Sequence, residues 1–144
     1  LQWLSQQANK DDWVLVRDAA RPCLPLGALT ALIGRARELG EGVILAEPVA
    51  DTLKEVAADG QVTGTVDRQT LWRAQTPQLF PLFALHTALA RCLEDGVSVT
   101  DEAMAMERAG ESVHVLRGPS SNIKVTVEAD LAFADWVLRT KGGH

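Results

Sequence analysis

The sequence lacks a glycine-rich phosphate loop, because neither G-x-G-x-x-G nor G-x-x-x-x-G-K-[ST] occurs in it. It also lacks an apolar run approaching the roughly 20 residues of a membrane span, and nothing in it resembles a secretion signal. Its two cysteines, Cys23 and Cys92, are too far apart for a Cys-x-x-Cys motif, and its three histidines are scattered. These absences weigh against a membrane protein, a disulfide-rich secreted protein and a Cys/His metal site, and they predict a cytoplasmic protein with reduced thiols.

Basic residues are also scarce, since 14 Lys and Arg stand against 19 Asp and Glu, giving a net charge of -5. A general nucleic-acid-binding protein usually carries a basic face, so any anion site in this chain is expected to be local. Hydrophobic residues, in contrast, make up 47% of the 144 residues, which is enough for one folded domain with a core. The sequence opens on Leu1 rather than methionine, and we expect it to be a piece of a longer chain.

The hydrophobic pattern of the first third of the sequence predicts a strand, a helix and a second strand. Residues 1–8 resemble the end of a helix, and Trp13–Val16 has the pattern of a short strand. Pro25 is suited to a first helical turn, and apolar residues then recur at helical spacing as far as Gly40. A second apolar run follows at Gly42–Ala46, so this order predicts a right-handed parallel βαβ unit.

A hairpin is predicted in the middle of the chain. Thr52–Val56 and Val62–Val66 have mixed polar and apolar faces and flank Asp59-Gly60, a dipeptide suited to a tight turn. So little apolar surface requires something for the hairpin to pack on. The remaining predicted elements are a strand at 71–78 that stops at Pro77, helices at 81–93, 101–109 and 126–139, a strand at 112–116 and an extended piece at 123–125, with Thr100 and Thr126 capping the last two helices.

The segment from Trp13 to Pro22 carries the first candidates for chemistry. It runs from an apolar strand directly into Asp18, two alanines and Arg21. The carboxyl ends of strands border the ligand crevice of open α/β sheets, so Asp18 and Arg21 are predicted to face a ligand there. An aspartate at the end of a strand is also a common turn former or helix cap, and this alternative stays open.

Lys124 is a further candidate, because it stands between two apolar residues in the sequence NIKVT at 122–126. This pattern predicts that its side chain points inward. A buried ammonium is costly unless an anion or a carboxylate meets it. Its partner is either the phosphate of a ligand or, in a structural salt bridge, Asp18 or Glu102.

Thr52 and Arg68 stand at the two feet of the hairpin and could grip one phosphate, although a solvated arm explains them equally well. Thr76 before a proline and Thr100 before an acidic helix start are ordinary strand-end and capping residues when each is taken alone. Taken together, a carboxylate for a divalent cation at Asp18, a lysine at the reacting phosphoryl group and a second phosphate site suit phosphoryl or nucleotidyl transfer.

Six motifs resemble, in order and across nearly the whole chain, those of the 2-C-methyl-D-erythritol 4-phosphate cytidylyltransferases of the non-mevalonate isoprenoid pathway. They are VRDAARP at 16–22, PVADTLK at 48–54, Asp67-Arg68, LWRAQTPQ at 71–78, TDEA at 100–103 and NIKVT at 122–126. The resemblance implies transfer of CMP from CTP to methylerythritol phosphate, with release of pyrophosphate and with Mg2+ as cofactor. It also implies an α/β fold, with a mainly parallel Rossmann-like sheet of the nucleotidyltransferase type and a protruding β-hairpin arm, 48–68, that forms a homodimer.

The resemblance assigns catalytic roles to Lys124, near the reacting phosphates, and to Asp18, which contacts the metal. It assigns substrate binding to Ala19, Ala20, Arg21, Thr52, Arg68, Thr76, Thr100 and Thr126. Within this set the alanines and Arg21 shape the floor of the site, and the two arm residues bind methylerythritol phosphate in the partner subunit.

The chain also departs from the family pattern. Arg17 stands where many relatives carry histidine, and Ser121 where an acidic residue is common. The family's glycine-rich CTP loop lies upstream of all six motifs, so residues 1–144 are predicted to be the carboxy-terminal part of a single domain and inactive alone. Two alternatives remain: a cytidylyltransferase for another polyol phosphate, such as ribitol 5-phosphate, and a non-catalytic substrate-binding or dimerisation fragment.

Overall fold

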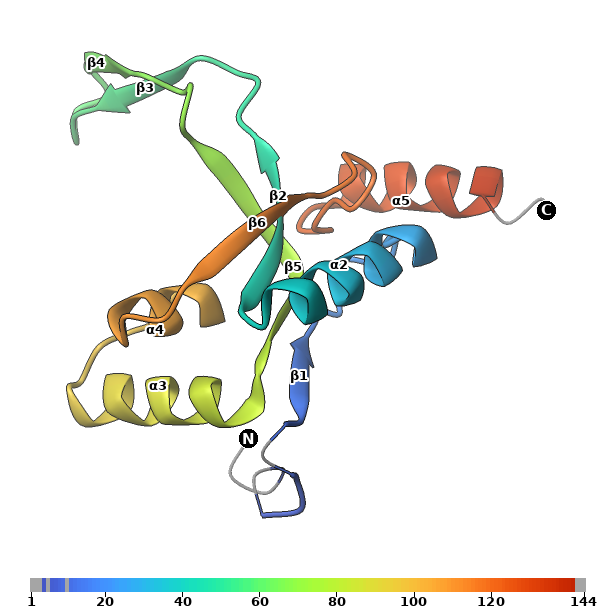
Figure 1. Ribbon diagram of the computed structural model, residues 1–144. Helices are drawn as coiled ribbons and strands as arrows, with labels where there is room; N and C mark the ends of the chain where they lie inside the picture. Colours follow the sequence, from blue (N-terminus) through green and yellow to red (C-terminus); the bar gives the residue numbers. More distant parts are fainter. Residues whose placement is uncertain (1–3, 5, 10, 142–144) are drawn as a thin grey trace.

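The computed structural model describes residues 4, 6–9 and 11–141 and is an α/β structure built on one four-stranded sheet (Figure 1). The helix end expected at 1–8 falls partly on residues outside these ranges. The sheet contains β1 (Trp13–Val16), β2 (Gly42–Pro48), β5 (Trp72–Pro81) and β6 (Val113–Arg117), in the order β1-β5-β2-β6.

The sheet is mixed. β5 runs antiparallel to both of its neighbours, while β2 and β6 pair in parallel, so β1, β2 and β6 all point the same way. The predicted unit of β1, α2 (Leu26–Leu39) and β2 is present, but β5 lies between its two strands. In this central place the second half of β5, from Pro77 to Phe80, is buried.

β5 is longer than the sequence predicted, since it continues through Pro77 to Pro81, and the expected stop at Pro77 was wrong. Proline is tolerated within a strand where the pairing is irregular. The pairing of β2 with β5 changes register between Ile44, opposite Gln78, and Ala46, opposite Ala74. Pro77 lies within this irregular stretch, and its peptide bond with Thr76 is cis.

The sheet is the middle of three layers, because successive residues of a strand point to opposite faces. Val43, Leu45 and Leu79 pack on one face against Leu32 and Ala36 of α2. On the other face, Ile44 and Phe80 pack against the buried sides of α3 (Leu82–Glu94) and α4 (Glu102–Arg108). Phe80, wholly buried, is the largest side chain in this core.

Two predicted helix caps are wrong. Asp101, not Thr100, is the N-cap of α4, because its carboxylate accepts a hydrogen bond from the N–H of Met104 at 3.0 Å. The last helix, α5 (Glu128–Lys141), begins two residues after Thr126. The Thr126 hydroxyl donates to Asp130 at 3.0 Å instead of accepting from a backbone N–H. In both cases a nearby carboxylate, which is a stronger acceptor than a hydroxyl, takes the free N–H groups.

The predicted hairpin is confirmed as β3 (Leu53–Val56) and β4 (Val62–Val66), a separate two-stranded sheet that projects from the body (Figure 1). Gly60 closes its turn with φ of 88°, a conformation that favours glycine. Val56 and Val62 are each 56% exposed, so the arm buries little of its own apolar surface. Among the described residues, no helix has the length and hydropathy required to cross a membrane.

Candidate active site

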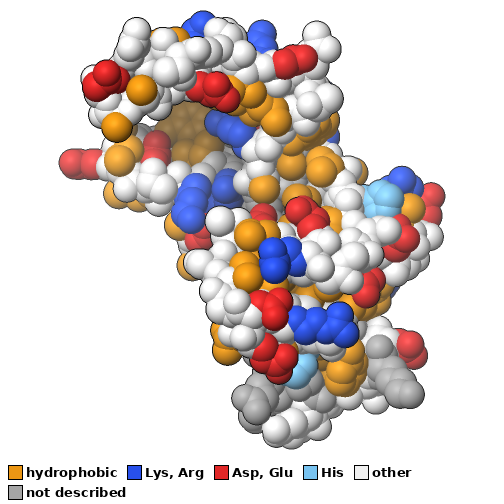
Figure 2. All heavy atoms as spheres, turned by 90° about the vertical axis from the view of Figure 1, so that its left-hand side faces the viewer, with side chains coloured by type: hydrophobic (Ala, Val, Ile, Leu, Met, Phe, Trp, Pro, Cys, Tyr) orange, Lys and Arg blue, Asp and Glu red, His pale blue; other side chains and the backbone are white. Residues whose placement is uncertain are grey.

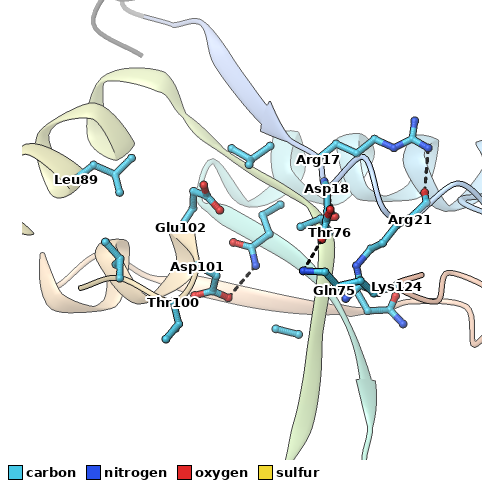
Figure 3. Close-up of a pocket in the computed structure, with 14 residues that line it drawn as sticks. Arg17, Asp18, Arg21, Gln75, Thr76, Leu89, Thr100, Asp101, Glu102 and Lys124 are labelled. Atoms are coloured by element: carbon cyan, nitrogen blue, oxygen red, sulfur yellow. Dashed lines mark hydrogen bonds and ion pairs between the residues drawn. The ribbon is translucent and has the colours of Figure 1, made fainter. Parts of the chain in front are cut away.

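A cavity of about 540 Å³ lies at the carboxyl end of β1, beside β5 and the start of α4 (Figure 3). It brings together five residues of the predicted site, which come from four separate segments of the chain. These are Asp18, Arg21, Thr76, Thr100 and Lys124. The strand-end position of Asp18 therefore predicted the place of the cavity correctly.

Asp18 is held by a tight turn that follows β1. The N–H of Arg21 donates to the Asp18 carbonyl at 3.1 Å, and the N–H of Ala20 donates to Asp18 Oδ1 at 3.0 Å. The small residues Ala19 and Ala20 form this turn but do not line the cavity. Asp18 is thus both a turn former and a cavity residue, so the two interpretations of its position are compatible.

The second carboxylate oxygen of Asp18 lies 2.9 Å from Lys124 Nζ, and the two side chains are 26% and 52% exposed. Lys124 is therefore not buried as the sequence suggested, because its segment lies outside the sheet and its side chain lines the cavity. Its hydrogen bond is the main cause that lowers the pKa of Asp18, and the N–H of Ala20 adds to it. The Asp18 carboxylate is thus ionised at neutral pH where it pairs with Lys124.

Arg21 contributes a second cation to the cavity. Its Nη1 donates to the carbonyl of Asn122 at 2.7 Å, which joins the turn after β1 to the loop after β6. Burial lowers the pKa of Arg21, and the charge of Asp18 opposes this shift. A guanidinium stays protonated in proteins, so Arg21 offers a fixed positive charge and further N–H donors.

Thr76 and Thr100 reach the cavity from opposite sides (Figure 3). The Thr76 hydroxyl accepts the N–H of Asp18 at 2.9 Å, which fixes the turn against β5. Thr100 precedes α4, whose first residues are held by the buried side chain of Gln78. This amide donates to Asp101 at 2.9 Å and accepts from the N–H of Ala103 at 3.1 Å.

Three of the predicted residues lie elsewhere. Thr52 and Arg68 are exposed on the arm and do not line the cavity of their own chain. The guanidinium of Arg68 donates to the carbonyl of Ala50 at the foot of the arm. Thr126 lines a neighbouring cavity of about 370 Å³. Figure 2 shows Lys and Arg side chains gathered beside a hollow in the upper half of the molecule, at the height where Figure 1 places the arm.

Sequence reasoning missed several residues that line the main cavity: Arg17, Gln75, Gln78, Asp101 and Glu102. Two of them carried a signal in the sequence, since Gln75 and Gln78 are amides in a largely apolar stretch. In the structure their side chains are only 6% and 1% exposed. A buried amide needs hydrogen-bond partners and so marks a built polar site. Across the described residues, no group of three or more His, Cys, Asp or Glu side chains is placed to hold a metal ion.

Comparison with known proteins agrees with this geometry. The family model of 2-C-methyl-D-erythritol 4-phosphate cytidylyltransferase matches residues 1–140. The chain belongs to this family. It is 47% identical over 141 residues to the family member of Acinetobacter baumannii (strain AYE), which covers 98% of the chain and 59% of that relative. The relative of Vibrio vulnificus (strain CMCP6) is 49% identical over 138 residues, covering 96% of the chain and 58% of the relative.

Solved structures of the family have the same fold. The Francisella tularensis enzyme superposes with a TM-score of 0.85 at 37% identity, over 92% of this chain and 62% of that one. The Thermus thermophilus enzyme gives 0.84 at 28% identity, over 96% and 66%. The predicted α/β fold of the nucleotidyltransferase type is thus confirmed. The chain spans about three fifths of the length of the curated relatives that it matches.

Proposed function

We propose that this chain is part of a cytidylyltransferase that transfers CMP from CTP to 2-C-methyl-D-erythritol 4-phosphate and releases pyrophosphate in the cytoplasm. The observation that carries the proposal is the cavity itself, in which Asp18, Arg21, Thr76, Thr100 and Lys124 meet. The relatives of the chain bear the name of this enzyme. These five residues supply two cations, two hydroxyls and one carboxylate, and such charged and polar groups suit a phosphorylated polyol better than an apolar ligand.

In the proposed reaction, a phosphate oxygen of methylerythritol phosphate attacks the α-phosphorus of CTP. A new P–O bond forms as the bond to the bridging oxygen of the β-phosphate breaks, and pyrophosphate leaves with that electron pair. Such transfers depend on positioning and on charge stabilisation. Lys124 stabilises the charge that grows on the α-phosphoryl oxygens, while Arg21, Thr76 and Thr100 orient the polyol phosphate. Thr126, in the neighbouring cavity, supports the segment that carries Lys124.

Mg2+ is the proposed cofactor, and one carboxylate is the protein ligand that we assign to it. Mg2+ is commonly held by one or two carboxylates together with substrate phosphates and water. Asp18 fits this role, since it lines the cavity and, among the described contacts, its Oδ2 is bonded only to the amine of a half-exposed lysine. When bound, the ion would neutralise phosphate charge, and the nucleotide would supply its remaining ligands.

The arm is proposed to complete the site of a second subunit. Thr52 and Arg68 are exposed, lie away from their own chain's cavity and offer a hydroxyl and a guanidinium for a phosphate. The arm also has exposed apolar residues, such as Val56 and Val62, that a partner subunit would cover. We therefore propose a homodimer with two equivalent sites, each built from one body and the partner's arm.

The experiment that tests the function compares two proteins. One is the 144-residue chain, and the other is a family-length chain, in which these residues are joined to the additional segment of the Acinetobacter baumannii relative. Pyrophosphate release is measured with CTP and 2-C-methyl-D-erythritol 4-phosphate. We expect only the family-length chain to turn over, because the 144 residues contain no glycine-rich loop to bind a triphosphate.

The same assay distinguishes the alternatives. A clear preference for ribitol 5-phosphate would replace the substrate and keep the reaction. Binding of the polyol phosphate without any turnover by the family-length chain would indicate a non-catalytic module. Turnover by the 144 residues at the rate of the family-length chain would show that no further segment is needed.

A further inference from the structure

Asn122 is a wholly buried polar residue in the loop that leads from β6 to Lys124, and it is bonded to two other segments of the site. Its side-chain Nδ2 donates to Gln75 Oε1 at 3.1 Å and to the carbonyl of Thr76 at 2.8 Å. Its Oδ1 has no hydrogen-bond partner among the described residues. The amide nitrogen is therefore what ties this loop to β5.

The backbone around Asn122 joins the same loop to the turn that holds Asp18. The Asn122 carbonyl accepts from Arg21 at 2.7 Å, and the N–H of Val125 donates to the carbonyl of Ala20 at 2.8 Å. Asn122 is thus bonded both to β5 and to the turn after β1. Lys124 stands between its two anchors, Asn122 and Val125, on a segment that belongs to no strand of the described sheets.

The contact between Asn122 and Gln75 is closely fitted. Gln75 is 6% exposed, and Gly118 lies directly beside its amide. A Cβ atom added at Gly118 would come within 2.3 Å of Gln75 Oε1, the atom that accepts from Asn122. The missing side chain at this position is what leaves room for the amide pair. A substitution at Gly118 therefore disturbs the pair without replacing any residue that lines the main cavity.

We propose that Asn122 is a positioning residue for Lys124, and this proposal rests on the function given above. Its amide holds the start of the segment 122–126 against β5, so that the lysine on this segment meets the α-phosphoryl group in register with Thr76 and Asp18. The side chain of Asn122 is 0% exposed and acts through its neighbours instead of on the substrate. A shift of about 1 Å in a reacting group can lower a rate on the order of 100-fold.

The kinetic test is a double-mutant cycle in the family-length chain, with Asn122→Ala, Lys124→Ala and both together. We expect Asn122→Ala to lower kcat by about 10- to 100-fold with little change in the KM for CTP. In the Lys124→Ala background it should cause little further loss, because the group that it positions is gone. Losses that multiply, or an unchanged kcat, would overturn the proposal.

Gly118→Ala reaches the same contact from its other side and decides the question should Asn122→Ala fail to fold. We expect it to lower kcat in the same direction, again without additional loss in the Lys124→Ala background. Leu32→Val serves as the control for general destabilisation, because Leu32 is a wholly buried residue of α2 and lines no part of the cavity. It should lower the melting temperature and leave kcat unchanged.

A second measurement does not depend on activity. Hydrogen exchange at the N–H of Val125, which bonds to Ala20, reports whether the segment is held. Asn122→Ala should speed exchange at Val125 and leave the amides of α3 unchanged, and equal exchange in the variant and the parent would contradict the proposal. If the parent protein does not turn over CTP and methylerythritol phosphate, the proposed function fails, while this exchange result still decides whether Asn122 positions the segment.

Discussion

Lys124 Nζ lies 2.9 Å from Asp18 Oδ2, while the other oxygen of that carboxylate accepts the N–H of Ala20. The two residues with proposed catalytic roles are therefore in direct contact. The two side chains are partly exposed, so solvent screens the ion pair, and its contribution to stability is small. Both residues line the cavity, which fits the proposed roles, and substitutions of the two residues should have different consequences.

Lys124→Ala is expected to lower kcat of the family-length chain by about 100- to 1,000-fold, with a much smaller effect on CTP binding. The reason is that the charge which Lys124 stabilises grows during transfer and is weaker in the bound substrate. Steady-state pyrophosphate release over a range of CTP concentrations separates the two effects. Arg35→Ala removes an exposed cation that pairs with Glu38 on α2, and this control should retain the parent kcat.

Asp18→Asn keeps the shape of the side chain but removes the charge, so it should shift the Mg2+ dependence of the reaction to higher concentrations. The measurement is the rate as a function of Mg2+ at saturating CTP. Asp135→Asn, which removes an exposed carboxylate paired with Arg139 on α5, is the matched control. An Asp18→Asn enzyme with the parent Mg2+ curve and kcat would leave Asp18 with the role of a turn former only.

The sequence predicted most strands, helices and the arm, because hydrophobic period and turn residues act locally. Gly40 and Gly60, for example, mark a helix end and a hairpin turn through their positive φ values of 68° and 88°. The insertion of β5 between β1 and β2 could not be predicted in this way, since pairing order depends on contacts between distant segments. The same limit explains Pro77, whose place in a strand depends on an irregular pairing with β2.

The candidate site was predicted where a motif placed a charged residue at a strand end, as with Asp18 and Arg21. Residues that build the site through buried hydrogen bonds, such as Asn122 and Gln75, were not assigned a role. Asn122 lies 47 residues along the chain from Gln75 and 46 from Thr76, the two residues that accept from its side chain. Spacing in the sequence does not show such pairs, whereas the fold does.

Gln78→Leu should lower the stability of the folded chain by about 1 to 3 kcal/mol. Gln78 is 1% exposed, and its Oε1 accepts the N–H of Ala103, which the substitution leaves buried without a partner. Chemical denaturation followed by circular dichroism measures the loss. Gln69→Leu is the control, because Gln69 is exposed beyond β4, and equal stability of the two variants would show that the Gln78 contacts contribute nothing.

Asp130 should make the start of α5 sensitive to acid. The N–H and hydroxyl of Thr126 and the N–H of Val127 all donate to its carboxylate and lower its pKa in the folded chain. Because this pKa is lower in the folded than in the unfolded chain, the ionised carboxylate stabilises the folded state at pH values above the ordinary pKa of an aspartate. This stabilisation is lost as the pH falls through the pKa of the folded chain. The stability difference between the parent and Asp130→Asn should therefore be present at pH 7 and shrink below about pH 4. Unfolding curves recorded at pH 7 and at several pH values below about 4 test this. A stability difference that does not vary with pH would contradict it.

The proposed exchange of arms leads to a test by subunit mixing. An Arg68→Ala chain has a defective arm and a sound body, whereas an Asp18→Asn chain has a sound arm and a defective body. At a Mg2+ concentration just sufficient for the parent, each should be nearly inactive as a family-length homodimer, because every one of its sites contains one defective part. In a mixed dimer, the arm of the Asp18→Asn chain reaches the body of the Arg68→Ala chain and restores one site of the two.

Random reassembly makes half of the dimers mixed, so roughly a quarter of the parent activity should return when the two chains are unfolded and refolded together. The composition of the dimers is checked with two different affinity tags, and each chain refolded alone is the control.

The guanidinium of Arg68 also bonds to Ala50 at the foot of its own arm, so Arg68→Ala could act by disordering the arm. Thr52 is exposed, so Thr52→Ala tests the arm with a smaller change. It should give the same recovery of activity in the mixture. Verified mixed dimers without recovered activity would show that the arm does not complete the partner's site.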